Sequence, residues 1–317
     1  MDNDTLLRIA LATLPTGVVS LVALLVVWWR TPTRRGAAPG SRAEPTLWRL
    51  LVPVVLVALA GTALYPLVFQ SGFPEFPPTR GRFAIPYIGI AALLAGLGVA
   101  AAHRLGPRAG VAITAAIAIG GIAAALVLTL RTQLLADGGW ERWRAVVGAF
   151  GVLAPVFVAG LVLLTRSSRR GLAPALSVFV VAFAVSQLLV VGYHSISESI
   201  MAAALCAVVG GLVGAAVFRP SVVFGSAGAV AIGLMMSMLL LQGASFGASD
   251  MPWRLVFAAM IAVSPFAALG ADLVAGKAGI TRAWARGVCM VGGAAALAIG
   301  AVAIAGRMYM QEASAGY

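Results

Sequence analysis

Long apolar runs alternate with short polar breaks along the whole chain. Each run approaches the roughly 20 residues that an α-helix needs to cross the hydrocarbon core of a bilayer. The pattern predicts ten spans, at residues 11–29, 50–69, 83–103, 109–130, 145–165, 172–192, 200–218, 222–241, 255–275 and 287–305. Only the segment 218–221 separates the seventh span from the eighth, so nine to eleven helices fit the pattern.

No soluble domain fits between these runs. The predicted fold is therefore all-α, a polytopic transmembrane helical bundle that forms one integral membrane domain over residues 1–317. The longest break, residues 30–49, is expected to be an arginine-rich cytoplasmic linker between the first two helices. Residues 1–165 and 166–317 show no internal repeat, because this linker has no counterpart after the sixth span.

Composition supports the same class of protein. Hydrophobic residues make up 61% of the chain and charged residues 10%, whereas about 25% of the residues in soluble domains are charged. The 22 basic residues include a single lysine, and alanine and glycine are abundant. This bias is typical of a genome rich in G and C, and we expect a multi-pass protein of a bacterial inner membrane.

The distribution of charge predicts the orientation. Of the 22 Lys and Arg residues, 14 lie in the connections that follow the odd-numbered spans, and 8 of the 10 acidic residues lie on the other side. Because cytoplasmic connections are enriched in Lys and Arg, both termini are expected to face the extracytoplasmic side. The basic linker is read as a topology signal that touches lipid headgroups, and no nucleic-acid partner is expected.

Small residues and prolines make further predictions about packing. Close helix contact is expected where small residues recur every four positions. The stripes are Ala116, Gly120 and Ala124; Gly210 and Gly214 with Ala203, Ala207 and Gly211 beside them; Gly225, Ala229, Gly233 and Ser237; and Gly292, Ala296 and Gly300. Prolines within spans are expected to kink or break their helices, at Pro53, Pro66, Pro86, Pro155 and Pro265.

The connection between the sixth and seventh spans gathers polar residues. Tyr193, His194 and Glu198 lie there, and Ser186 and Gln187 precede them by about two helical turns. This group is a candidate substrate-binding site. The alternative is a local one: residues 195–198 match the S-x-x-E capping box, in which serine and glutamate satisfy free amides at a helix start.

Two further candidates lie in the ninth span. Ser264 precedes Pro265 near its middle, where a helix break could expose backbone carbonyls to a substrate. Asp272 lies near its inner end, where it could bind a cation, pair with Lys277 or reach the interface. Neither a metal site nor a catalytic residue is predicted, and we expect no cofactor.

The sequence lacks the P-loop, H-E-x-x-H and C-x-x-C patterns. An enzyme is therefore disfavoured, although a membrane transferase that uses His194 and Glu198 stays open. The first hypothesis is a small permease or exporter of a neutral or amphipathic solute, with a cavity in mid-membrane. The alternative is a non-catalytic structural or accessory subunit, with a solid bundle and an exposed small-residue stripe for a membrane-protein partner or a second copy.

Overall fold

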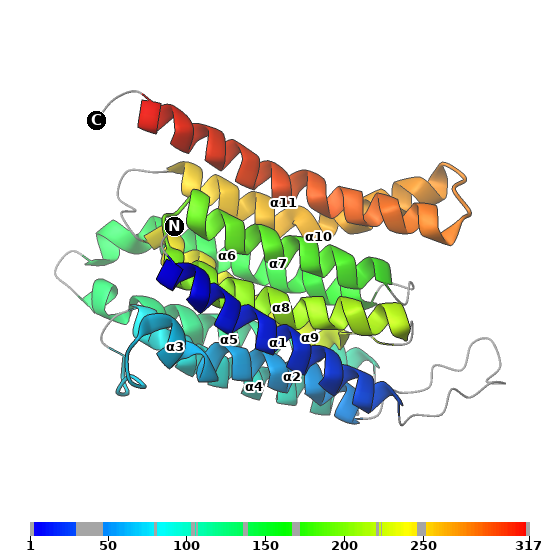
Figure 1. Ribbon diagram of the computed structural model, residues 1–317, viewed down its shortest axis with the longest axis horizontal. Helices are drawn as coiled ribbons and strands as arrows, with labels where there is room; N and C mark the ends of the chain where they lie inside the picture. The colour runs from blue at the N-terminus through cyan, green and yellow to red at the C-terminus, as the bar shows by residue number, and fades with distance from the viewer. Residues whose placement is uncertain are drawn as a thin grey trace.

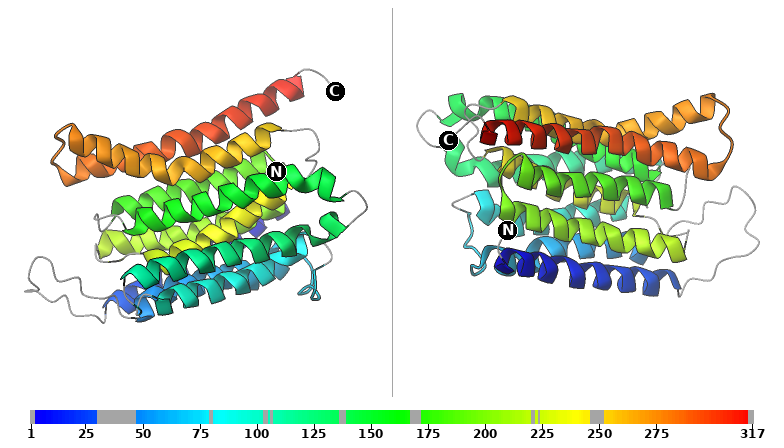
Figure 2. Two further views of the ribbon diagram at one scale, coloured as in Figure 1. Left: turned by 180° about the vertical axis from the view of Figure 1, so that it is seen from behind. Right: turned by 45° about the horizontal axis from the view of Figure 1, so that its top comes forward.

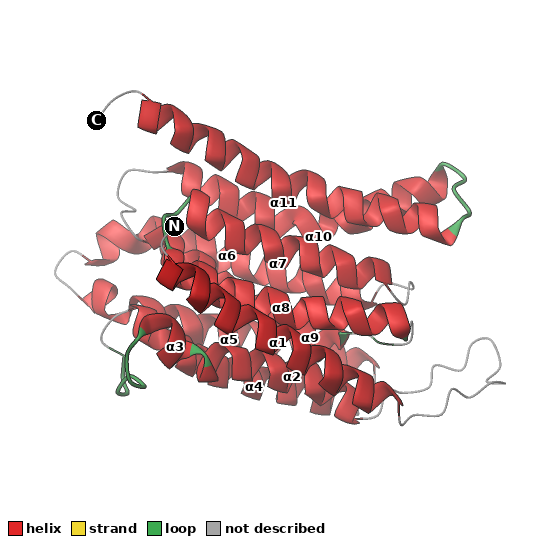
Figure 3. Cartoon of the chain, in the orientation of Figure 1, coloured by secondary structure: helices red, strands yellow, loops and turns green. Residues whose placement is uncertain are grey.

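Helices are the only regular secondary structure in the described residues. The computed structural model describes residues 3–29, 47–78, 81–102, 105, 107–135, 139–166, 172–219, 222, 224–245 and 252–314, and no strand occurs in these ranges (Figure 3). The helices are α1 (Asn3–Trp29), α2 (Leu47–Ala63), α3 (Tyr65–Phe69), the 3₁₀ helix η1 (Gly81–Ala84), α4 (Ile85–Ala102), α5 (Pro107–Leu135), α6 (Gly139–Arg166), α7 (Leu172–Val191), α8 (Ile196–Phe218), α9 (Gly225–Ser245), α10 (Pro252–Lys277) and α11 (Ala283–Ser314).

Ten helical segments in the described ranges are long and apolar enough to cross a membrane, and each coincides with a predicted span. The second and third consist of α2 with α3 and of η1 with α4. The doubtful break after the seventh span is real, because α8 ends at Phe218 and α9 begins at Gly225. Most of the expected linker, residues 30–46, lies outside the described residues, and α2 begins at Leu47.

One helix occupies the centre of the bundle. In α9 every residue from Ser226 to Ala244 is buried, which is unusual for an apolar helix that has lipid as an alternative neighbour. Around it, α2, α4, α5, α6, α10, α7 and α8 follow one another, each packing on the next, and α8 closes the ring on α2. Outside this ring, α11 packs on α10 and α7, and α1 packs on α8 and α2 (Figures 1 and 2).

The start of α1 and the end of α11 lie at the same end of the bundle, as ten antiparallel crossings require (Figure 1). We call this the terminal end. It also carries the segment after α3 and the turn between α7 and α8, whereas the turn between α10 and α11 lies at the opposite end.

Only one of the five span prolines lies at an interruption within its span. The second span breaks at Leu64, and Pro66 stands in the first turn of α3, where a missing amide is harmless. Pro86 is the second residue of α4. The helices continue through Pro53, Pro155 and Pro265, so no break occurs at these three positions, and the kinks stay a prediction.

The small-residue predictions divide into two pairs. On α8, an added Cβ at Gly211 would lie 2.8 Å from the backbone nitrogen of Leu21 in α1. On α9, Ala229, Gly233 and Ser237 of the stripe are buried as expected, and Gly225 is half-buried. The other two stripes make no such close helix contact within the described part of the chain. Ala116, Gly120 and Ala124 are exposed, and α5 packs through Ala118, Ile122 and Ala125 instead. On α11, Gly292 meets nothing within 4 Å, and its neighbour Gly293 makes the close contact.

Candidate functional site

Tyr193 holds the α7–α8 turn against the start of α10. Its side chain is 1% exposed, and its hydroxyl donates a 2.6 Å hydrogen bond to the carbonyl oxygen of Arg254. The Arg254 guanidinium lies 5.7 Å from the centre of the Tyr193 ring. Burial raises the pKa of the phenol, because phenolate would lose its hydration, and the positive charge of Arg254 only partly opposes this.

His194 points away from this buried contact. It adopts a left-handed backbone conformation with φ of 54°, and its exposed imidazole packs on Tyr309 of α11 with ring centres 4.8 Å apart. Among the described residues, no three of the His, Cys, Asp and Glu side chains lie close enough together to hold a metal ion.

The capping box has its residues in the predicted places but different bonds. Ser195 is the N-cap of α8, and Glu198 is the third residue of the helix. The Ser195 hydroxyl donates to the Glu198 carboxylate instead of accepting from a backbone amide, so Ser195 makes no side-chain cap. The reciprocal capping box is therefore wrong. Glu198 is only 4% exposed, and its carboxylate is turned into the protein.

Ser186 joins α7 to α8. Its hydroxyl donates to the carbonyl oxygen of Ser199 at 3.1 Å, and the Ser199 hydroxyl donates back to the carbonyl oxygen of Ser186 at 2.8 Å. Both hydroxyls are buried and satisfied. Gln187, the next residue, is half-buried. This pair explains why polar residues are tolerated here between two apolar helices.

The two candidates in α10 also have protein partners. The Ser264 hydroxyl is completely buried and donates to the carbonyl oxygen of Ile261 at 2.7 Å, within its own helix. Asp272 pairs with Arg286 of α11: Nε and Nη2 of the arginine each lie 3.1 Å from a different carboxylate oxygen. The partner is thus in the next helix, whereas the nearby Lys277 is exposed.

These positions do not form one site. Tyr193, His194, Ser186 and Glu198 cluster around the α7–α8 turn, but they make separate contacts with α10, α11 and α8. Ser264 and Asp272 lie further along α10. Binding of a substrate by any of the seven residues stays a prediction.

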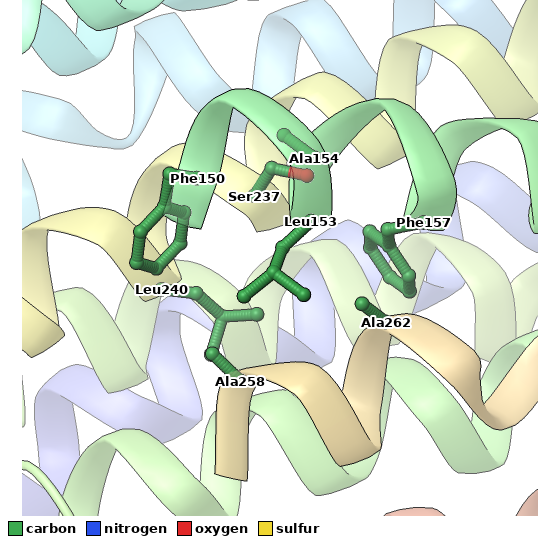
Figure 4. Close-up of a pocket in the computed structure, with 8 residues that line it drawn as sticks. All are labelled: Phe150, Leu153, Ala154, Phe157, Ser237, Leu240, Ala258 and Ala262. Carbon is green, nitrogen blue, oxygen red and sulfur yellow. The ribbon is translucent and has the colours of Figure 1, made fainter. Parts of the chain in front are cut away.

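A small hollow lies where α6, α9 and α10 meet (Figure 4). It has room for about one water molecule. None of the seven candidates lines it; its walls are Phe150, Leu153, Ala154, Phe157, Ser237, Leu240, Ala258 and Ala262. Ser237, near the middle of α9, is 2% exposed, and its hydroxyl has no hydrogen-bond partner. The sequence flagged Ser237 only as one of the small packing residues.

Tyr65 was missed by the sequence analysis. It is completely buried in α3, where its hydroxyl lies beside that of Ser71 and within electrostatic range of Glu198. The one available signal was a tyrosine beside Pro66 in an otherwise apolar span, and its proximity to Glu198 depends on the packing of α3 on α8.

No protein-family model, no curated protein and no solved structure matches the chain. The class of the protein therefore rests on its own architecture. Over its described residues it is an all-helical bundle, whose ten long apolar helices are consistent with a multi-pass membrane protein.

Proposed function

We propose that the protein is a non-catalytic subunit that packs against another helical membrane protein, or against a second copy of itself, in a bacterial inner membrane. The observation that carries this proposal is the outward face of α5. Only 17% of its most apolar window is buried within the chain, and Ala116, Gly120 and Ala124 form an exposed stripe along it.

Such a stripe suits a helix interface more than it suits lipid. Lipid tails are as apolar as leucine side chains, so burial of apolar surface does not drive two helices together in a membrane. Helix association there depends on close approach of the two backbones. At Gly120 an added Cβ would meet nothing within 4 Å, so no helix in the described part of the chain packs closely against this position. The enclosed α9 also favours a solid scaffold, because it fills the space that a central path would need.

The orientation follows from the charge distribution. The connections at the end opposite the termini carry most of the Lys and Arg residues. In the proposed arrangement these connections face the cytoplasm, and the terminal end faces the extracytoplasmic side.

The test is the mass of the protein extracted in a mild detergent. We expect the wild type to elute as a stoichiometric assembly and Gly120→Leu to elute as the single chain, because leucine would hold the partner helix away. Gly151→Leu is the matched control, since Gly151 of α6 is also exposed and also meets nothing within 4 Å. A homogeneous wild-type monomer, or an assembly unaffected by Gly120→Leu, contradicts the proposal.

Ser237 supports a second candidate, a small permease or exporter of a neutral or amphipathic solute. An unpartnered hydroxyl is costly at membrane depth, and Ser237 presents one at the hollow between α6, α9 and α10. Widening of this seam would open a route beside α9. In a host lacking the protein, wild type but not Ser237→Leu should restore tolerance to one of a panel of such solutes. Equal complementation by both contradicts this candidate.

A further inference from the structure

Two exposed phenylalanine rings lie close together at the terminal end. Phe73 is 53% exposed and Phe76 is 67% exposed. Both belong to residues 71–78, which follow α3 and are part of no helix. Single exposed apolar side chains are common on protein surfaces, so the argument depends on how these two rings are held and on the level at which they lie.

Tyr87 of α4 holds both rings in place. Its hydroxyl donates a hydrogen bond to the carbonyl oxygen of Pro74, which lies between the two phenylalanines in the sequence. The centre of the Tyr87 ring is 6.0 Å from that of Phe73 and 5.2 Å from that of Phe76, and both pairs are edge-to-face, a favourable geometry. The two rings are thus fixed on α4 although they stay exposed. We call them the aromatic surface.

The same contacts fix the level of the aromatic surface along the bundle. Tyr87 is the third residue of α4 and the sixth of the span Arg82–Ala102. At about 1.5 Å per residue, its backbone lies about 8 Å inside the span. The rings that pack on it therefore lie at the level of the first turns of the span. The ribbon agrees, because the loop after α3 lies beside the helices and does not extend past their ends (Figures 1 and 3).

The backbone of the segment sets a limit to its depth. Irregular backbone is not tolerated in contact with the hydrocarbon region, because its amides and carbonyls need water or headgroups. Glu75, between the two rings in the sequence, is exposed and charged, and it sets the same limit. Arg82 is exposed at the first residue of the span, where lipid phosphates would lie. The backbone therefore suits the headgroup region, and the rings suit the layer directly beneath it.

We propose that Phe73 and Phe76 insert into the boundary between headgroups and acyl chains of the leaflet at the terminal end, and so anchor residues 71–78 to the lipid surface. Phenylalanine is among the side chains that enter this boundary, to a depth of about 5–10 Å. A protein partner in the water fits less well, because the aromatic surface lies beside a span. The anchor requires a membrane protein, but neither the assembly through α5 nor a route past Ser237, so each proposal can fail alone.

The experiment measures the depth of a nitroxide label at Gly72. An added Cβ at Gly72 would meet nothing within 4 Å, so a label there leaves both rings in place. The full-length chain, with Cys206 and Cys289 replaced and one cysteine at position 72, is labelled and reconstituted in phosphatidylcholine vesicles. Spin-resonance spectroscopy then gives the collision rates of the label with oxygen, which concentrates in lipid, and with a water-soluble nickel chelate.

Two reference labels calibrate the ratio of the oxygen rate to the nickel rate. Gly151 is exposed within the span of α6 and represents lipid, and Ala278 is exposed in the turn between α10 and α11 and represents water. We expect the ratio at Gly72 to lie between the two reference values. A ratio at Gly72 equal to that at Ala278 overturns the proposal and leaves the aromatic surface to a partner in the water. The Gly151 label reports separately whether the bundle is inserted.

A double variant tests whether the two rings hold the segment in the lipid. Phe73→Ser with Phe76→Ser should lower the ratio at Gly72 to the value at Ala278. Trp140→Ser is the matched control, because Trp140 is a 58% exposed aromatic residue at the same end but belongs to α6. It should leave the ratio at Gly72 unchanged. A ratio that the double variant does not lower, or that both variants lower equally, contradicts the anchor.

Discussion

Two adjacent glycines of α11 should respond oppositely to the same substitution. An added Cβ at Gly293 would lie 2.6 Å from the carbonyl oxygen of Ala267 and 2.8 Å from the Cβ of Ala271, both in α10. At Gly292 the same atom would meet nothing within 4 Å. Alanine at Gly293 must therefore push α10 and α11 apart, and alanine at Gly292 needs no adjustment.

The expected difference in the free energy of unfolding follows from one contribution that both variants share and from others that only Gly293→Ala has. Both gain about 1 kcal/mol from the better helix propensity of alanine. Only Gly293→Ala is destabilised by overpacking, by about 1–3 kcal/mol, because the opposing atom belongs to the backbone and cannot move to another rotamer. It also loosens other contacts between the two helices. Gly293→Ala should therefore be about 1–3 kcal/mol less stable than Gly292→Ala.

Thermal unfolding of both variants in the same detergent measures the difference. We expect Tm of Gly292→Ala to equal or exceed that of the wild type, and Tm of Gly293→Ala to fall below that of Gly292→Ala by about 2 °C or more. Equal Tm values for the two variants would refute the close approach of α10 and α11 at Gly293.

Three other contacts predict losses of stability, each measured by thermal unfolding. Asp272→Asn should destabilise the protein by about 1–3 kcal/mol. This is less than the usual cost of breaking a fully buried ion pair, because Arg286 is partly exposed. Lys277→Gln should have little effect, because Lys277 is exposed. Ser186→Ala and Ser199→Ala should each cost about 1 kcal/mol and the double variant less than their sum, since both remove the same contact; strict additivity would contradict the pair. Tyr193→Phe should cost about 1–2 kcal/mol by leaving the Arg254 carbonyl oxygen without this donor, and an unchanged Tm would contradict that bond.

The helices could be predicted from the sequence because each is a long apolar run with its own boundaries. The packing face of a helix could not be predicted as well. In α5 nearly every position is small or apolar, so the stripe with Gly120 and the buried face with Ile122 look alike in the sequence. The side that lies inward depends on which neighbour approaches, here α4, α6 and α9.

The polar contacts show the same division between local and distant information. The start of α8 directly after Ser195 was predictable, because the S-x-x-E spacing acts within one helical turn. The partner of Asp272 was not predictable, because Lys277 is closer in the sequence than Arg286, which lies in the next helix. Tyr65 and Glu198 are more than 100 residues apart in the sequence, and only the packing of α3 on α8 brings them together.

The burial of α9 has the most direct consequence for function, and thiol labelling tests it. Single cysteines would be placed along Ser226–Ala244 in a chain whose own Cys206 and Cys289 are replaced, and treated in membranes with a small water-soluble thiol reagent. Thiols react as thiolates, which need water. A helix enclosed on all sides predicts labelling at the ends of α9 and none along its middle. Labelling that recurs along one face through Ser237 would instead reveal a water-filled route and contradict the solid bundle.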